Sequence, residues 1–225
     1  MNRDIEPEVL EKLISQSDHK ELLISLVDTS RKYIGWYTTQ RSRSFEYPWI
    51  AAQLGNAAGK RIVDIGAGCS PLPLHLADAG AQVTTIDYSP AVPSKNIRSE
   101  WGFLNYKELN PSMTSINADA TTVELKDIDV VYSVSAMEHM PATVRRAVIR
   151  RVSEWLKLGG LLLLTLDMAP GSDALWNRDR GKDVEDQNIH GNLDDVKAEL
   201  SNAGLRVDEC ERKTYNVVMI RAVRV

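Results

Sequence analysis

The chain has 225 residues, of which 43% are hydrophobic and 26% charged, the balance of a soluble globular protein. Its 27 Lys and Arg residues against 31 Asp and Glu residues give a net charge of −4, without the basic surplus typical of nucleic-acid binders. The net charge does not exclude a local basic patch. Two cysteines, Cys69 and Cys210, are too few for a disulfide framework and predict a cytoplasmic protein with free thiols. The polar N-terminus is unlike a secretory signal, and no apolar run approaches the roughly 20 residues of a membrane-spanning helix.

Residues 1–55 predict a helical appendage, because apolar residues recur there at helical spacing. An aromatic and basic stretch at residues 33–49 is open to two interpretations. In one, it is a helix whose aromatic side chains pack on the main domain. In the other, it is a lid over a ligand, into which Arg41, Arg43 or Glu46 reaches.

From residue 60 onward, short apolar strands alternate with helices. Five strands joined in this way indicate right-handed crossovers and a parallel sheet. A short turn then joins two further strands into a hairpin, so the last strand is expected to enter the sheet antiparallel. The expected fold class is therefore α/β, a Rossmann-like doubly wound sheet of seven strands, mostly parallel. The strands are expected at residues 61–65, 82–87, 114–117, 129–134, 161–167, 205–212 and 216–225.

Three helices are expected between these strands, at residues 70–79, 143–158 and 193–202. The second has an apolar stripe and is expected to end at Gly159-Gly160, and the third at Gly204, because glycine favours the backbone conformation that closes a helix.

Ligands of a doubly wound sheet bind beyond the carboxyl ends of its strands, where we therefore look for a site. After the first strand, Gly66 and Gly68 allow a tight turn and the close approach of a ligand. The G-x-G-x-x-G fingerprint of dinucleotide binding is incomplete, because Pro71 replaces its third glycine. The carboxylate of Asp64 also suits a cationic or amine-bearing ligand better than a pyrophosphate. Asp87 ends the second strand, where an acid can accept hydrogen bonds from both hydroxyls of a ribose.

These features resemble the class I methyltransferases that use S-adenosylmethionine. The likeness extends over residues 60 to 225. It rests on the Asp64-x-Gly66-x-Gly68 turn, Asp87, the segments Asn117-Ala118-Asp119-Ala120 and Ser133 to His139, and the terminal hairpin. The resemblance implies a catalytic domain at residues 56–225 that binds S-adenosylmethionine, with residues 1–55 as an N-terminal helical lid.

The resemblance also implies roles at the first two strands. The backbone of Gly66, Ala67 and Gly68 is expected to line the methionine moiety and the sugar of the cofactor. Asp64 is expected to hold the amino group through water, and Asp87 to bind the ribose hydroxyls. In the alternative, Asp64 caps a turn and Asp87 caps the following helix.

By the same resemblance, Tyr88 is expected beside the adenine. Asp119 is expected to accept a hydrogen bond from the adenine amine, and the Ala120 N–H to donate to a ring nitrogen. Ser133 and Val134 are expected to contact the methionine part through their backbone. The alternative for Asp119 is an acid that closes a turn.

His139 is the candidate general base. Methyl transfer is an in-line displacement for which the cofactor carries the activation, and an oxygen or nitrogen acceptor that carries a proton also needs a base. His139 follows the fourth strand, and an imidazole titrates near neutral pH. Glu138 is expected to orient it or to cap the next helix. The alternative is a histidine in an exposed loop.

The methyl acceptor is expected to be a small molecule, but the segments expected to contact it, residues 30–50 and 168–190, carry no readable code. The polar segment that ends at His190 either closes over the acceptor or is a solvated loop. The candidate acceptor-binding residues are Tyr37, Arg41, Arg43, Tyr47, Glu138, Asp167 and His190.

No metal is expected, because the stretch after the fourth strand offers only Glu138 and His139. No membrane or nucleic-acid partner is expected either. The arginines at 145, 146, 150 and 151 predict a solvated helix face, and the Asn/Asp-Pro-Pro-Tyr motif of base methylators is absent. Two functions compete with methyl transfer. One is a nucleotide-dependent oxidoreductase, which Pro71 and Asp64 disfavour, and the other is a non-catalytic binding module with the same fold.

Overall fold

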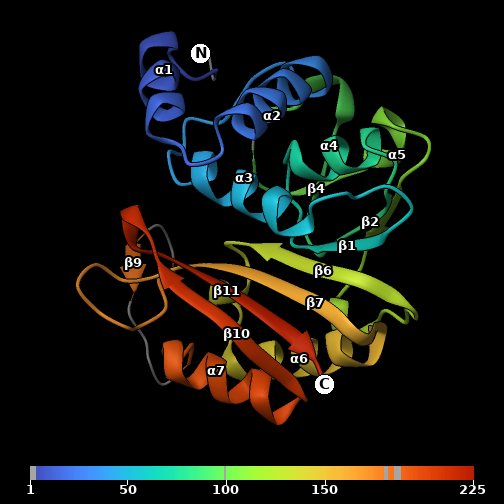
Figure 1. Ribbon diagram of the computed structural model, residues 1–225, viewed down its shortest axis with the longest axis vertical. Helices are drawn as coiled ribbons and strands as arrows, with labels where there is room; N and C mark the ends of the chain where they lie inside the picture. The colour runs from blue at the N-terminus through green and yellow to red at the C-terminus, as the bar shows by residue number, and fades with distance from the viewer. Residues whose placement is uncertain (1–3, 99, 180–181, 185–188) are drawn as a thin grey trace. The chain divides into compact units, whose positions relative to one another are not determined.

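The computed structural model describes residues 4–98, 100–179, 182–184 and 189–225 (Figure 1). Contacts within the chain divide it into two compact units, residues 1–118 and residues 119–225. No helix in these described ranges combines the length and the apolar character needed to cross a bilayer. The boundary expected at residue 55, between a lid and a catalytic domain, stays a prediction.

The first unit contains the helical N-terminus and three parallel strands. Its helices are α1 (Pro7–Gln16), α2 (Lys20–Tyr33), α3 (Arg43–Leu54), α4 (Leu72–Asp78) and α5 (Tyr106–Leu109). Its main strands are β1 (Arg61–Ile65), β2 (Gln82–Asp87) and β5 (Thr114–Asn117), and the short elements β3 (Ala91–Val92), η1 (Ser94–Asn96) and β4 (Phe103–Leu104) lie between β2 and α5.

The strand β2 pairs with β1 on one side and with β5 on the other, both in parallel. In this register Asp64 lies opposite Thr85, and Asp87 lies opposite Asn117. Parallel strands end at the same edge of a sheet, so the chain leaves β1, β2 and β5 on one side. The topology therefore places the predicted turn at Gly66 and the carboxylate of Asp87 at the same edge.

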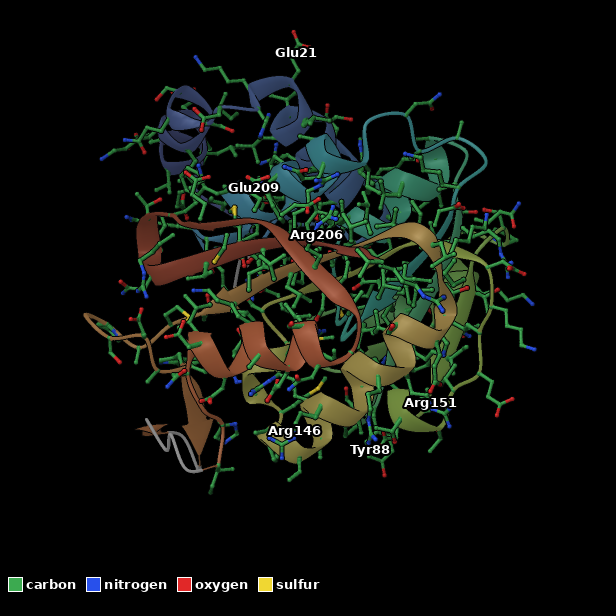
Figure 2. All side chains as sticks on the ribbon, turned by 60° about the horizontal axis from the view of Figure 1, so that its bottom comes forward. Glu21, Tyr88, Arg146, Arg151, Arg206 and Glu209 are labelled. Atoms are coloured by element: carbon green, nitrogen blue, oxygen red, sulfur yellow. The ribbon has the colours of Figure 1, made fainter. Side chains whose placement is uncertain are left out.

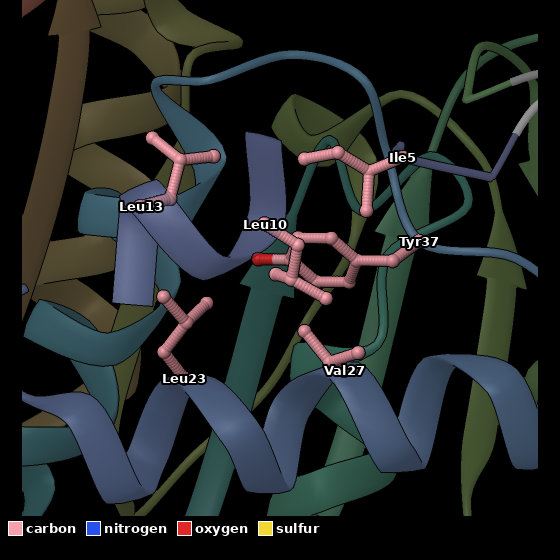
Figure 3. Close-up of a cluster of buried hydrophobic side chains, with 6 residues drawn as sticks. All are labelled: Ile5, Leu10, Leu13, Leu23, Val27 and Tyr37. Carbon is pink, nitrogen blue, oxygen red and sulfur yellow. The ribbon is translucent and has the colours of Figure 1, made fainter. Parts of the chain in front are cut away.

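An apolar cluster joins α1 to α2. Figure 3 shows the ring of Tyr37 among side chains that come from both helices. The cluster consists of Ile5, Leu10, Leu13, Leu23, Val27 and Tyr37. A ten-residue helix such as α1 is marginal alone in water, so this burial accounts for its stability.

The second unit contains four strands of the main sheet. These are β6 (Ile128–Val134), β7 (Leu156–Asp167), β10 (Leu205–Arg212) and β11 (Val217–Arg224). Its α-helices are α6 (Ala142–Trp155) and α7 (Leu193–Asn202), and its short elements are η2 (Ala120–Thr122), η3 (Met137–His139), β8 (Asn177–Asp179), β9 (Lys182–Val184) and η4 (Thr214–Asn216).

Within this unit the strands run in the order β10-β11-β7-β6. The pair β6 and β7 is parallel, whereas β11 is antiparallel to both β7 and β10. The hairpin therefore delivers its last strand antiparallel, as predicted. The predicted fold class is confirmed: the protein has a Rossmann-like, seven-stranded, mostly parallel sheet with an antiparallel C-terminal hairpin.

The expected end of α6 is wrong. The helix ends at Trp155, before Gly159-Gly160, and these glycines lie inside β7. The pairing of β6 with β7 shifts there, from Ile128 opposite Leu156 to Val130 opposite Leu161, and Gly159 has a φ of 76°. The glycines thus mark an irregularity of the strand rather than a helix cap.

The arginines of α6 do not form one solvated face. Figure 2 shows Arg146 and Arg151 on the outer side of the helix. Arg145 is instead fully buried and forms an ion pair with Glu199 of α7. A charged side chain is buried in this way only when a partner compensates its lost hydration, and the sequence pattern of α6 does not reveal that partner.

Candidate active site

The turn after β1, residues 66–70, carries the two glycines of the predicted cofactor site. Gly66 and Gly68 have φ values of 73° and 51°, in the left-handed region that glycine adopts readily. At least four N–H groups of the turn donate to the chain itself. The acceptors for Gly66, Gly68, Cys69 and Ser70 are, in turn, the Ile86 carbonyl (2.8 Å), Asp87 Oδ2 (2.9 Å), the Glu100 carbonyl (3.0 Å) and Tyr106 Oη (2.7 Å).

This pattern of donors decides which ligands the turn suits. A pyrophosphate site needs N–H groups that point at the anion, and here most of them are already used. Carboxylates stand at the same edge instead, since Asp64 is 2% exposed at the end of β1 and Asp87 ends β2. These carboxylate acceptors fit the amino group and ribose hydroxyls of S-adenosylmethionine better than the pyrophosphate of a dinucleotide.

Asp87 holds the turn directly. Its Oδ2 accepts from the N–H of Gly68, and its Oδ1 accepts from the hydroxyl of Ser89. No helix starts directly after β2, so the alternative role of Asp87 as a helix cap is not what the structure shows. The predicted ribose contact of Asp87 stays a prediction, as does that of Tyr88 with adenine; Tyr88 is 79% exposed.

Asp119 closes a turn in the second unit. Its Oδ1 accepts from both the N–H and the hydroxyl of Thr121, each at 2.8 Å, and so caps the short helix η2. The turn role that the sequence left open is therefore present. The expected contacts of Asp119 and Ala120 with adenine remain predictions.

The end of β6 carries Ser133 and Val134, the expected backbone contacts of the methionine part. Ser133 is buried, and Ser135, the residue after Val134, has a φ of 43°. The N–H of Ser135 donates to the carbonyl of Thr165 at 2.9 Å, which fixes this unusual backbone conformation. The structure thus holds the chain in a sharp bend where β6 leads to His139.

Glu138, His139 and Asp167 belong to one network in the second unit. The buried Glu138 accepts from the N–H of Asp167 through Oε1 at 3.0 Å. The carbonyl of Asp167 accepts from the N–H of Trp176 at 2.9 Å. The Trp176 ring packs edge-on against His139, with centroids 5.4 Å apart and an interplanar angle of 71°. The network thus restrains the imidazole through the ring of Trp176.

His190 contacts the backbone of the segment that carries His139. It is buried, and its Nδ1 lies 3.2 Å from the carbonyl oxygen of Met140, the residue after His139. The N–H of Ala142 donates to the carbonyl of Ile189 at 2.8 Å. His190 is therefore not exposed to solvent. It lies beside the segment that carries Glu138 and the candidate base His139.

The candidate acceptor residues of the N-terminal region do not share one environment. Tyr37 lies in the apolar cluster of α1 and α2, and Arg43 forms a buried ion pair with Glu46. Tyr47 is buried, and burial raises its pKa well above the ordinary value. Arg41 is exposed. Their roles in acceptor binding stay predictions.

Two residues of the first unit touch the turn although no sequence motif points to them. Tyr106 and Glu100 lie 36 and 31 positions after Ser70 and Cys69, respectively, and both contact backbone atoms of the turn. A contact to the backbone leaves no signature in the residue types. Across the described ranges, no cluster of three His, Cys, Asp or Glu side chains is arranged to bind a metal ion.

Comparison with known proteins identifies the family. The methyltransferase domain family matches residues 37–209. The ubiquinone biosynthesis O-methyltransferase of Xanthomonas oryzae pv. oryzae is 31% identical over 128 residues, which are 56% of the chain and 51% of that relative. The chain spans about half the length of the curated relatives it matches.

Solved structures agree in fold. An S-adenosylmethionine-dependent methyltransferase from Mesorhizobium loti has a TM-score of 0.58 at 19% identity and covers 80% of the chain and 97% of its own. The glycopeptide N-methyltransferase MtfA, complexed with S-adenosylmethionine, has a TM-score of 0.58 at 20% identity, with coverages of 80% and 93%. The family match spans more than half of the chain, and the resemblance inferred from the motifs is therefore confirmed: the chain belongs to the methyltransferase domain family, in the class I S-adenosylmethionine-dependent group.

Proposed function

We propose that the chain transfers a methyl group from S-adenosylmethionine to an oxygen or nitrogen of a small molecule, such as a secondary metabolite or a glycan precursor. Relatives named for O-methylation and neighbours named for N-methylation support this range of acceptors. When bound, S-adenosylmethionine supplies a methyl carbon activated by its sulfonium. The protein then has to hold the acceptor in line and to take up its proton.

The proposed cofactor residues are those expected from the motifs, in two sets. Asp64, the turn from Gly66 to Gly68, and Asp87 with Tyr88 form the first, and Asp119, Ala120, Ser133 and Val134 form the second. The observation that carries the proposal is the bond from the Gly68 N–H to Asp87 Oδ2 at 2.9 Å. It aligns the glycine turn with the acid, and each carboxylate oxygen keeps a second lone pair that can accept from a ribose hydroxyl. Since the turn's N–H groups are largely used, the oxidoreductase alternative loses its pyrophosphate site.

We assign the role of base to His139. In this role a ring nitrogen of His139 accepts the proton of a hydroxyl or amine acceptor, while the edge-on packing of Trp176 limits rotation of the imidazole. Glu138 fixes the end of β7 through the N–H of Asp167 and so supports Trp176 indirectly. A carboxylate acceptor is already ionised and needs no base, so dependence on His139 also reports the acceptor class.

The cofactor site is tested by titration with S-adenosylhomocysteine and, separately, with NAD. We expect Asp87→Ala to weaken S-adenosylhomocysteine binding by at least about tenfold, because the half-buried N–H of Gly68 loses its partner and the ribose loses an acceptor. Asp28→Ala, an exposed acid on α2, is the matched control and should leave the affinity unchanged. Binding of NAD alone would contradict the proposal.

The base is tested by turnover on a panel of phenols, alcohols and amines, followed through release of S-adenosylhomocysteine. We expect His139→Ala to lower kcat by about 10²-fold or more with unchanged S-adenosylhomocysteine affinity. His19→Ala at the start of α2 is the control. Equal turnover of the two variants would remove His139 from the mechanism.

A further inference from the structure

The hydroxyl of Tyr106 bridges the glycine turn from outside the predicted cofactor site. Tyr106 begins α5 and is fully buried. Its Oη accepts from the N–H of Ser70 at 2.7 Å and lies 3.0 Å from the carbonyl oxygen of Gly68 and 3.1 Å from that of Ser70. Burial raises the pKa of this phenol well above its ordinary value, so the hydroxyl keeps the proton with which it donates.

A second contact to the same turn comes from Glu100, between η1 and β4. Its carbonyl oxygen accepts from the N–H of Cys69 at 3.0 Å. A Cβ added at Gly68 would collide with that oxygen, so this close approach of the two backbones requires a glycine at position 68. The segment before β4 therefore covers the turn directly.

The segment that carries Glu100 is itself tied to the N-terminal region. The carboxylate of Glu100 accepts from the hydroxyl of Thr38, and the carbonyl of Ile97 accepts from the indole N–H of Trp36 at 2.9 Å. Both donors follow α2 and flank Tyr37, one of the predicted acceptor residues. The covering segment is thus bonded to the turn through the carbonyl of Glu100 and to residues 36–38 through Ile97 and the Glu100 carboxylate.

We infer that the connection between β2 and β5 is a brace that holds the turn in its ligand-binding conformation, with Tyr106 as the positioning residue. The inference rests on the proposed cofactor site and extends it to residues that do not touch the cofactor. A turn fixed by the fold does not have to be ordered when the ligand binds, which improves affinity. Asp87 accepts from the N–H of Gly68 and the Tyr106 hydroxyl lies 3.0 Å from its carbonyl oxygen, so the two contacts together fix both backbone groups of Gly68.

Tyr106→Phe tests the brace, because it removes one oxygen atom and leaves the ring in place. Calorimetric titration with S-adenosylhomocysteine should give a dissociation constant about tenfold higher, since a buried N–H and a carbonyl lose their partner. Hydrogen exchange should accelerate at the amides of residues 68–70, while the far-ultraviolet circular dichroism stays native. Tyr33→Phe is the matched control, because it removes a hydroxyl that bonds to Asp78 at 2.8 Å, away from the turn.

The outcomes separate the brace from the cofactor site. Weaker binding by Tyr106→Phe, with Tyr33→Phe unchanged, supports the brace. Unchanged binding by Tyr106→Phe while Asp87→Ala binds weakly overturns the brace and leaves the cofactor site standing. Equal losses in both tyrosine variants also overturn it, because the effect is then not specific to the turn. Unchanged binding by Asp87→Ala overturns the cofactor site, and the brace with it.

Glu100→Ala keeps the test decisive where Tyr106→Phe does not fold. It cuts the tether to Thr38 but keeps the backbone carbonyl, so we expect a smaller effect, about a threefold increase in the dissociation constant with faster exchange at Cys69. Native circular dichroism together with wild-type affinity and wild-type exchange in Glu100→Ala would overturn the brace.

Discussion

The glycine turn contains a buried cysteine, Cys69, whose thiol is sensitive to the groups around it. Cys69 is buried between the contacts of Gly68 and Ser70. Burial raises the pKa of its thiol to about 12, and the charges of Asp87 and Glu100 act in the same direction. A thiol with this pKa is almost entirely protonated near neutral pH and is a poor nucleophile. In the folded protein Cys69 therefore fills space in the turn and reacts only slowly.

The two cysteines should differ in labelling by a thiol reagent. Cys210, on β10, is exposed, although partial burial raises its pKa too. At a pH of about 8, we expect the native protein to react quickly at one thiol and the protein unfolded in guanidinium chloride at two. Native Cys210→Ser should react only slowly, as Cys69 becomes accessible. Fast labelling of native Cys210→Ser would show that the turn opens readily.

At the scale of elements, a buried ion pair joins α6 to α7. Arg145 Nε donates to Glu199 Oε2 at 2.7 Å and Nη2 donates to Oε1 at 2.9 Å, a bidentate arrangement. Nη1 also lies 3.4 Å from the carbonyl oxygen of Met140, next to His139. The pair thus links the packing of two helices to the segment that carries the proposed base. Removing one partner leaves the other charge buried and uncompensated.

Glu199→Ala should lower the free energy of unfolding by about 3–5 kcal/mol, because Arg145 remains buried without a counter-charge. The double variant Arg145→Met, Glu199→Leu should recover most of that loss, since the pair's desolvation cost disappears with it. Lys197→Ala, which breaks an exposed pair with Asp194, should change stability by less than about 1 kcal/mol. Urea unfolding measures all three; a single variant as stable as Lys197→Ala would contradict the importance of the buried pair.

For the whole molecule, stability should depend on the protonation of His75 in α4. Burial lowers its pKa from the ordinary 6.5, and Asp78 opposes this only in part. The unfolded chain then binds a proton at a pH where the folded chain does not, so unfolding takes up protons. The stability that neutral His75 contributes is fully present above pH 6.5 and is lost as the pH falls from there toward the folded-state pKa.

His75→Gln should therefore flatten the pH dependence of the melting temperature just below pH 6.5. The measurement compares the slope of melting temperature against pH in the wild type, in His75→Gln and in His19→Gln. His19→Gln controls for the loss of a histidine elsewhere in the chain. A His75→Gln slope identical to that of the wild type would assign the pH dependence to other groups.

The sequence predicted those parts of the molecule that depend on local pattern. The expected ranges of β2 and β5 match the structure residue by residue, because turn-forming residues on either side fix where each short strand begins and ends. The expected end of α6 does not match, because Gly159-Gly160 has the same appearance in a helix cap as in an irregular strand. The partners of Tyr106 are backbone atoms far away in the chain, so no residue pattern encodes them.

The close contact between Gly68 and Glu100 restricts the amino acid at position 68 more strongly than the one at position 100. The bond from Cys69 uses the carbonyl of residue 100, which every amino acid possesses, so a change of side chain there removes the tether to Thr38 but leaves this bond in place. Position 68 has no such freedom, because its Cβ would occupy the space of that oxygen. A chimera that imports a glycine turn from another methyltransferase must therefore import residues 97–106 with it, as one transplantable unit.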